Sequence, residues 1–244
     1  MIKKLTNSVL GVFGCELRRR RPPPPSRLEA FFQTWKSLNE APSFIIDVGA
    51  NHGSWTRSAF DYFPTAKYLM VEPQDRLKEY SHDLLQRPGT RWLNAGICDQ
   101  VGSMRLTLPP RDDSATFSVS EKDAQALGYR QIDVPVTTLD EIVRQEQQIP
   151  EMVKIDAEGF DLRALKGASK LLGVTEVFFA ECTICEPQNE NTLKAVCSFM
   201  WEKGYRIFDF TDLNHSPKYG ALWLTEAVFV RESSPVWGKI PSYS

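Results

Sequence analysis

The 244-residue sequence lacks a long apolar run, and none approaches the roughly 18 consecutive apolar residues that indicate a membrane-spanning helix. It also lacks a surplus of positive charge, since 29 Lys and Arg face 31 Asp and Glu for a net charge of −2. Because nonspecific nucleic-acid binding draws on a broad basic surface, nucleic acid is not an expected partner. A small, specific ligand is favoured, and the oligomeric state is left open.

Cysteine and histidine are scarce as well. The five cysteines are odd in number and scattered, unlike a disulfide framework, which favours a reducing, cytoplasmic compartment. Cys182 and Cys185 form a lone CxxC pair, which is weak evidence for zinc without a second pair. The three histidines are His52, His82 and His215. No metal site is predicted from these residues.

The first 25 residues differ from the rest in composition, because they contain RRRR followed by PPPP. Apolar residues recur at near-helical spacing up to Leu17, so a basic amphipathic helix on an anionic membrane is one hypothesis. An unfolded or partner-bound arm is the alternative, because Gly11 and Gly14 weaken a helix and the proline run is a stiff spacer. We expect a cytoplasmic protein in which residues 1–25 are the candidate for peripheral membrane contact.

The remainder of the chain is long enough for one α/β core. Ser26 caps a predicted amphipathic helix, and apolar runs then alternate with helical stretches. Strands are predicted at 43–48, 67–72, 91–97, 151–155, 174–181, 205–210 and 222–230, and helices at 54–63, 75–86, 138–145, 160–171 and 190–203. The segments VGSMRLTLP and QIDVPVT are two further extended stretches that flank the polar loop RDDSATFS. This alternation is typical of a mostly parallel sheet with helices on both faces.

We therefore divide the chain into an arm with its amphipathic helix (1–40), one main domain (41–232) and a tail (233–244). In the main domain, the segment FIIDVGANHG from Phe44 to Gly53 places an acid and two glycines directly after an apolar run. That order predicts a buried strand that ends in a tight turn near a cofactor. Glu72 closes the next apolar run, KYLMVE, where a carboxylate could accept the two hydroxyls of an adenosine ribose. The two features together predict a nucleoside-cofactor site.

Further acids follow other predicted strands. Asp156 and Glu158 follow VKI, and Glu181 ends VTEVFFAE. Because the carboxyl ends of parallel strands meet at one edge of a sheet, we expect these acids near the cofactor turn. They are the candidates for a general base, and bracing of the loop is the alternative role for Glu158. Converging carboxylates could also hold a divalent metal, which is an alternative that we do not favour.

Four segments resemble the SAM-dependent methyltransferases of the FkbM type: DVGANHG (47–53), VEP (71–73), TLDEI (138–142) and KIDAEGFDLRALKGA (154–168). The resemblance runs from about Phe44 to Arg231. One departure is Asp161, where the family usually has glutamate. The resemblance implies a Rossmann-like, seven-stranded, mostly parallel sheet with helices on both faces, which is the class I methyltransferase fold. It also implies S-adenosyl-L-methionine as the cofactor and O-methylation of a hydroxyl on a sugar, glycan or natural product.

The resemblance also suggests roles for particular residues. The main chain at Gly49, Asn51 and Gly53 would approach the cofactor, and Asp47 would orient its amino group or the turn itself. Glu72 would accept the ribose hydroxyls, and either Asn94 or Asp99 would recognise adenine. Asp156 would lie nearest the methyl group if its strand sits beside the first. The candidate substrate contacts are Asp113, Ser114 and Thr116 in the polar loop, and His215.

Two other functions fit parts of the sequence. A nicotinamide-dependent oxidoreductase also combines a glycine turn with an acid about 20 residues later, although this chain lacks GxGxxG. A non-catalytic nucleoside-binding or scaffold protein would account for the basic, proline-rich start.

Overall fold

The computed structural model describes residues 24–39, 41–186 and 189–240. The membrane-helix hypothesis falls on residues that lie almost wholly outside these ranges. No described helix combines the length and apolar character needed to cross a bilayer.

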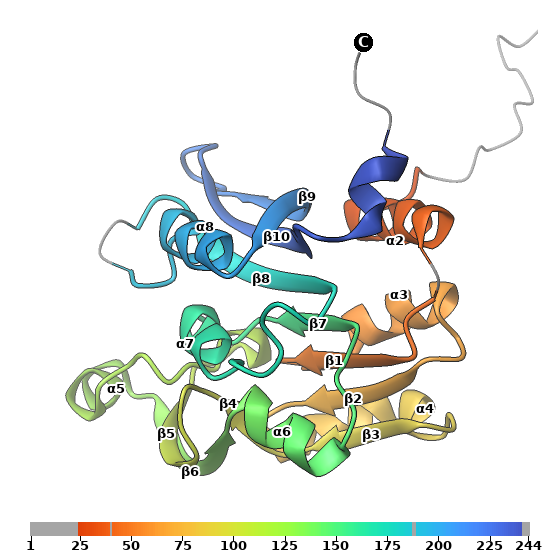
Figure 1. Ribbon diagram of the computed structural model, residues 1–244. Coiled ribbons are helices and arrows are strands. Elements are labelled where there is room, and N and C mark those ends of the chain that lie inside the picture. The colour runs from red at the N-terminus through yellow and green to blue at the C-terminus, as the bar shows by residue number, and fades with distance from the viewer. Residues whose placement is uncertain (1–23, 40, 187–188, 241–244) are drawn as a thin grey trace, which may run out of the picture.

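The centre of the molecule is a seven-stranded sheet in the order β3-β2-β1-β7-β8-β10-β9 (Figure 1). Its strands are β1 (Phe44–Val48), β2 (Lys67–Val71), β3 (Thr90–Leu93), β7 (Met152–Ile155), β8 (Val177–Thr183), β9 (Tyr205–His215) and β10 (Leu222–Arg231). The first five in this order pair in parallel, and β10 runs antiparallel to both β8 and β9. This is the strand order of the class I methyltransferase fold, so the predicted fold is confirmed.

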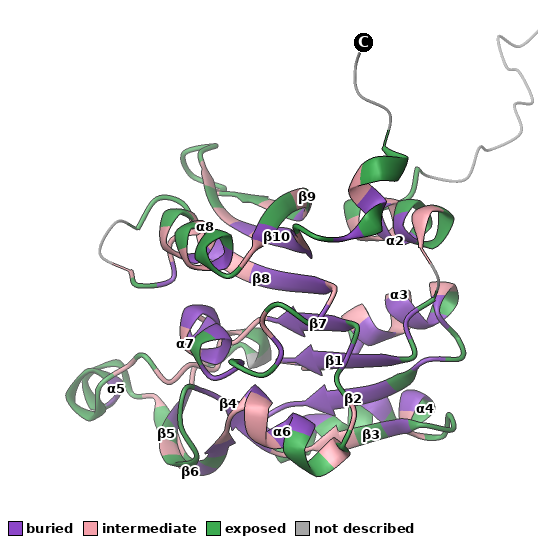
Figure 2. Ribbon diagram, viewed as in Figure 1, coloured by how far each residue is buried: buried purple, intermediate pink, exposed green. Residues whose placement is uncertain are grey.

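Helices cover both faces of this sheet. They are α2 (Arg27–Leu38), α3 (Ser54–Tyr62), α4 (His82–Leu85), α6 (Leu139–Glu146), α7 (Asp161–Lys166) and α8 (Leu193–Glu202). Buried side chains of α6, α7 and α8 pack on one face, and those of α2, α3 and α4 pack on the other. Figure 2 shows the central strands buried between these two layers.

Helix α2 begins where the sequence predicted. Ser26 accepts a hydrogen bond from the Glu29 amide, and the Glu29 carboxylate accepts one from the Ser26 amide, which completes a capping box. Phe31 is fully buried and its ring meets Phe179 of β8 edge to face, with the centroids 5.0 Å apart. This helix is therefore part of the packed core. The short helix η3 (Pro235–Lys239) also packs on the core through the buried Val236.

Some predicted boundaries were wrong. The predicted strand 91–97 divides into β3 and β4 (Gly96–Ile97), and β4 belongs to a second sheet with β6 (Arg130–Thr137) and β5 (Gly102–Leu108). The predicted helix 75–86 is a 3₁₀ turn, η1 (Asp75–Ser81), followed by the short α4. Helix α7 ends five residues early, and at Gly167 the chain approaches the Cys98 carbonyl so closely that a Cβ atom would lie 2.3 Å from it.

One helix and one strand extension were missed. Helix α5 (Glu121–Leu127) lies in the segment between β5 and β6, although Ser120 caps its start and Gly128 adopts the left-handed conformation at its end. Strand β9 continues to His215, because the second half of β9 pairs with β10 across a hairpin. His215 therefore ends a strand instead of lying in an open loop.

Candidate functional site

Two adjoining clefts open at the carboxyl edge of the sheet, where β1 and β7 are neighbours. The first cleft has an empty volume of about 600 Å³, part of it open to solvent. It is lined by Val48, Gly49, Asn51, Val71, Glu72, Pro73, Gln74, Ala95, Gly96, Ile97, Asp113, Ala115, Phe117, Asp156, Ala157 and Glu158. The second cleft is larger, about 1580 Å³, and both clefts include Gly49, Asn51, Asp113 and Asp156. The β1–β7 boundary is where the sheet order reverses, the usual position for a ligand in an open α/β sheet.

The glycine-rich turn after β1 forms the wall between the clefts. Gly49 has a φ of 70°, and a Cβ atom there would lie 1.8 Å from the Asp156 carbonyl oxygen. Gly53 has a φ of 78°, and a Cβ atom there would meet Leu84 and Ser81 within 2.8 Å. The structure thus gives both glycines a packing reason, because Gly49 admits the chain after β7 and Gly53 admits α4.

Glu72 lies at the end of β2 in the first cleft. Its Oε1 accepts a hydrogen bond from the Gln74 amide at 2.9 Å, and its Oε2 accepts one from the Asn51 amide at 3.0 Å. Burial raises the pKa of Glu72, although these two bonds and the charge of Lys154 oppose that effect. Each oxygen keeps lone-pair capacity for a further donor. The carboxyl group is therefore held by the turn and can still accept ligand hydroxyls.

The opposite side of the first cleft is apolar, and the sequence analysis missed its main residue. Phe117 lines the cleft from the loop between β5 and β6. A Cβ atom at Gly96 would lie 2.6 Å from the Phe117 ring, so the glycine makes room for it. A single phenylalanine in a polar loop gave no signal in the sequence.

The two candidates for adenine recognition lie outside the residues that line the clefts. Asn94 donates from Nδ2 to the backbone carbonyls of Glu72 and Pro73, so its amide fixes the end of β2. Asp99 pairs with Arg163 at 2.7 Å, and hydrogen bonds from Arg163 and Cys98 lower the pKa of Asp99 to about 2. Their role in adenine binding stays a prediction.

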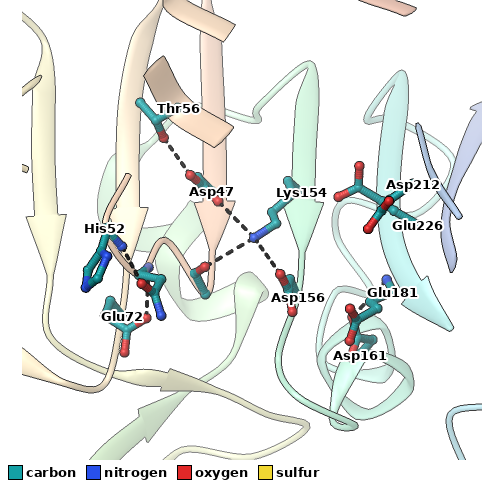
Figure 3. A network of polar contacts seen from close by, with 12 residues as sticks. Asp47, His52, Thr56, Glu72, Lys154, Asp156, Asp161, Glu181, Asp212 and Glu226 are labelled. Atoms are coloured by element: carbon teal, nitrogen blue, oxygen red, sulfur yellow. Dashed lines mark hydrogen bonds and ion pairs between the residues drawn. The ribbon is translucent and has the colours of Figure 1, made fainter. Parts of the chain in front are cut away.

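A buried lysine joins the acids of β1 and β7 (Figure 3). The Nζ of Lys154 lies 3.5 Å from Asp47 Oδ1 and 3.1 Å from Asp156 Oδ2, and it donates to the Gly49 carbonyl at 3.1 Å. Asp47 is fully buried and also accepts a 2.6 Å hydrogen bond from the Thr56 hydroxyl. Burial raises the pKa of Asp47, against the opposing effects of Lys154 and Thr56. Asp47 therefore anchors the turn from beneath the clefts.

The loop after β7 has an unusual backbone. Glu158 has a φ of 49° and Gly159 a φ of 91°, so two consecutive residues are left-handed. A side chain in this conformation is uncommon and is often found at functional sites. The Thr116 hydroxyl donates to the Glu158 carbonyl at 3.0 Å, which ties the polar loop to this turn. Burial and the nearby Asp156 and Asp113 raise the pKa of Glu158 to about 8.

The second cleft contains two acids that face each other across neighbouring strands. Glu181 of β8 is directly opposite Glu226 of β10 in the antiparallel register, so their side chains share one face of the sheet. Burial raises the pKa of Glu181 to about 10, with further contributions from Asp156 and Asp161. Burial raises the pKa of Glu226 to about 7, and the charge of Lys154 opposes this shift. At neutral pH this part of the cleft can therefore hold carboxyl protons.

The remaining predicted residues are placed as follows. Asp113 lines both clefts and pairs with Arg111 at 2.7 Å, and Ser114 donates to Asp113. His215 is exposed and lines neither cleft. Asp161, the departure from the family pattern, is buried and accepts hydrogen bonds from the Glu181 amide and the Asn191 side chain. It fixes β8 next to the site.

No group of three or more His, Cys, Asp or Glu side chains in the described part of the chain is arranged to hold a metal ion. Cys182 is buried, Cys185 is exposed, and both are free thiols. The CxxC pair therefore forms no crosslink in the structure.

Residues 47–207 match the family model of the methyltransferase FkbM domain, which covers more than half of the chain. The chain belongs to the FkbM methyltransferase family. This membership confirms the resemblance found in the motifs, with S-adenosylmethionine as the cofactor, and decides against a nicotinamide-dependent oxidoreductase. The glycine turn, Glu72 and the KIDAEG segment all lie within the matched region.

A curated relative is methyltransferase sdnD of Sordaria araneosa, which is 26% identical over 161 residues. The match covers 52% of this chain and 61% of the relative, so the chain spans less than two thirds of that protein.

Two solved methyltransferases are similar in fold. The precorrin-6y C5,15-methyltransferase of Geobacter metallireducens has a TM-score of 0.48 at 12% identity, covering 89% of this chain and 94% of that one. The N-methyltransferase NodS of Bradyrhizobium japonicum has a TM-score of 0.48 at 8% identity, covering 84% and 94%. These values are too low to inform function, and the fold assignment rests on the strand order.

Proposed function

We propose that this protein transfers the methyl group of S-adenosylmethionine to a hydroxyl of a sugar, glycan or natural product. The observation that carries the proposal is the position of Asp156 at the junction of the two clefts. A cofactor in one cleft and an acceptor in the other would both reach this carboxylate.

The lining of the first cleft fits the cofactor in its chemistry. Glu72 is already oriented by two backbone amides and would accept the ribose hydroxyls. Phe117 and Ile97 supply an apolar surface for the adenine ring. Bound here, S-adenosylmethionine would supply an electrophilic methyl group on a positively charged sulfur.

The second cleft is the proposed acceptor site. Hydroxyl and carboxyl groups line it, including Ser54, Ser58, Thr211 and Asp212, and Trp55 adds an aromatic face. Such a lining suits an acceptor with several hydroxyls, because each hydroxyl both donates and accepts hydrogen bonds. Helix α2 also borders this cleft through Ser26 and Leu28.

Asp156 is the proposed proton acceptor. The bound cofactor would supply the methyl group to the acceptor oxygen and keep the electron pair of the carbon–sulfur bond, and the Asp156 carboxylate would take up the proton that the acceptor hydroxyl loses. Positioning accounts for the larger part of the acceleration, roughly 7–11 kcal/mol, and a general base adds about 10²–10⁴-fold. Glu158 and Glu181 remain proposed alternatives for the proton acceptor.

The test is a two-stage measurement on the full chain. Calorimetric titration with S-adenosylhomocysteine should show one site per chain, and labelled S-adenosylmethionine should then methylate members of a panel of sugars, glycans and polyols. Absence of binding by folded protein would refute the methyltransferase proposal. Binding without transfer to any member would favour the non-catalytic nucleoside-binding alternative.

A further inference from the structure

We propose that Lys154 is a positioning residue for methyl transfer: one buried ammonium holds the Asp156 carboxylate and the Gly49 carbonyl together. The proton acceptor and the cofactor-binding turn would then share a single anchor. This inference rests on the proposed function.

Three groups surround the ammonium of Lys154. It reaches the Asp156 carboxylate and the Gly49 carbonyl, each at 3.1 Å, and its side chain is 5% exposed. Asp47 lies 3.5 Å away and forms an ion pair with it, without a hydrogen bond to Asp47 Oδ1. A lysine held in this way has little freedom to move.

Burying the charge of Lys154 costs free energy of folding. Lys154 is in β7 between Val153 and Ile155, which are fully buried. Burial alone would lower the pKa of this lysine, but the charges of Asp156, Asp47 and Glu226 outweigh it and raise the pKa. Because a well-packed apolar side chain often serves stability as well as a buried ion pair, stability alone explains this lysine poorly.

The geometry couples two segments that are far apart in the sequence. Lys154 is in β7 and Asp156 directly follows that strand, so the two side chains, two positions apart, lie on the same side and meet at 3.1 Å. The Asp156 side chain is 34% exposed, and the bond to Lys154 restrains it. One carboxylate oxygen is thereby engaged, which leaves the other for an acceptor hydroxyl. The same ammonium fixes the Gly49 carbonyl in the turn that borders the cofactor cleft.

The charged groups around Lys154 come from several elements. They are Asp47 of β1, Glu72 after β2, Asp156 and Glu158 after β7, Asp161 of α7, Glu181 of β8 and Glu226 of β10. Lys154 is the cation that acts on all of them, so its removal would change the pH dependence of transfer as well as its rate.

The experiment compares Lys154→Met, Lys154→Arg and the control Arg231→Met. Arg231 forms an ion pair with Glu176 at 2.9 Å in a part of the sheet that lines neither cleft. For Lys154→Met we expect a fall in kcat of about 100-fold, as for a catalytic group misplaced by about 1 Å, with the KM for the acceptor little changed. The low-pH limb of activity should move to higher pH, because a nearby positive charge is lost.

Two further readouts separate positioning from general stability. Without ligand, hydrogen exchange in Lys154→Met should increase in residues 47–53 and 156–160 together, and in Arg231→Met in neither. Lys154→Arg should recover part of the rate and the wild-type pH limb, because it keeps the charge. If Lys154→Met does not fold, the double variant Asp47→Asn/Lys154→Met removes the charges of both Asp47 and Lys154. The low-pH limb of this double variant should still move to higher pH, and that of Asp47→Asn alone should not.

The outcomes are distinguishable. The inference would be overturned if Lys154→Met kept the wild-type kcat and low-pH limb. It would also be overturned if hydrogen exchange became faster in only one of the segments 47–53 and 156–160. A wild-type protein that binds no S-adenosylhomocysteine would instead refute the proposed function, and the exchange measurement would still decide whether Lys154 joins the two segments.

Discussion

The two clefts meet at Asp156, but Glu72 in the first cleft is held differently from Glu181 and Glu226 in the second. In the first cleft, both oxygens of Glu72 accept backbone amide hydrogens at 2.9 and 3.0 Å. In the second cleft, Glu181 and Glu226 oppose each other on neighbouring strands, and within the described residues neither carboxyl group accepts a hydrogen bond from a backbone amide. A carboxylate fixed by the main chain suits a ligand of constant shape. Carboxyl groups that can hold protons at neutral pH can either donate to or accept from ligands that differ in their hydroxyls.

The clefts also differ in how the chain assembles them. Most of the first cleft comes from the ends of three parallel strands and the turns that follow them. The second cleft combines residues from α2, α3, β8, β9 and β10, which are distributed over almost the whole described chain. In the proposed function, the constant cofactor therefore occupies the cleft built mostly from the ends of neighbouring parallel strands, and the acceptor occupies the cleft that combines elements from across the fold.

The largest effect should follow from removal of the charge at the junction. Asp156→Asn keeps the shape of the side chain but cannot take up the proton of the substrate hydroxyl, so the rate of methyl transfer should fall by about 10²–10⁴-fold. Cofactor affinity should change by less than about tenfold, because the turn and Glu72 stay intact. Single-turnover transfer and calorimetry measure the two effects.

Asp133→Asn is the matched control, because Asp133 is exposed on β6 and lines neither cleft. It should transfer at the wild-type rate. Full activity in Asp156→Asn would show that Glu158 or Glu181 is the proton acceptor. Asp156 would then not connect the two clefts in the way proposed.

The next largest effect should be confined to the first cleft. Glu72→Gln replaces a charged acceptor, and hydrogen bonds to charged groups contribute about 1.5–3 kcal/mol. We expect S-adenosylhomocysteine to bind about 10- to 150-fold more weakly, with kcat at saturating cofactor close to wild type. An equal loss in kcat would show that Glu72 also affects the acceptor side, and the contrast between the clefts would not hold.

The sequence predicted the main sheet well because its strands carry strong local signals. The runs that became β1, β2 and β7 are apolar, buried and short, and turn residues or acids bound them. The failures fall where local signals are weak or where distant contacts decide. Helix α7 stops before Gly167, where the chain passes so close to Cys98, 69 positions earlier, that a Cβ atom would lie 2.3 Å from the Cys98 carbonyl.

The site shows the same division. Gly49 and Glu72 lie in motifs that the sequence reveals, and both line the first cleft. Lys154 could have been noticed as a charge inside the buried run MVKI. Glu226 had no such signal, because its partner Glu181 is 45 positions away and only the β8–β10 register brings the two together.

A pH-dependent effect on stability tests the second cleft. The pKa of Glu226 is raised from 4.5 to about 7, so the folded state holds this proton more tightly than the unfolded state. The stabilising effect is complete below about pH 4.5 and is lost as the pH rises to 7. Glu226→Gln has no carboxyl group to ionise and therefore does not lose this stability as the pH rises. Its free energy of unfolding should exceed that of wild type by about 1–3 kcal/mol at pH 8 and nearly equal it at pH 4.5.

Urea unfolding at these two pH values measures the difference. Glu232→Gln is the control, because Glu232 pairs with Arg206 on the surface and is 49% exposed. A difference for Glu226→Gln that is the same at both pH values would show that no proton is held there, and the second cleft would then resemble the first.

The smallest effect concerns the apolar side of the first cleft, the part that no motif predicted. Phe117→Leu keeps an apolar side chain but removes a flat ring, and aromatic stacking contributes about 0.5–1.5 kcal/mol. We expect S-adenosylhomocysteine to bind roughly 2- to 10-fold more weakly, and Phe199→Leu, on α8 away from both clefts, to have no effect. Because Phe117 is in the loop tied to Glu158 through Thr116, a larger loss combined with slower transfer would indicate that the ring also orders this loop. The first cleft would then depend on tertiary packing as much as the second.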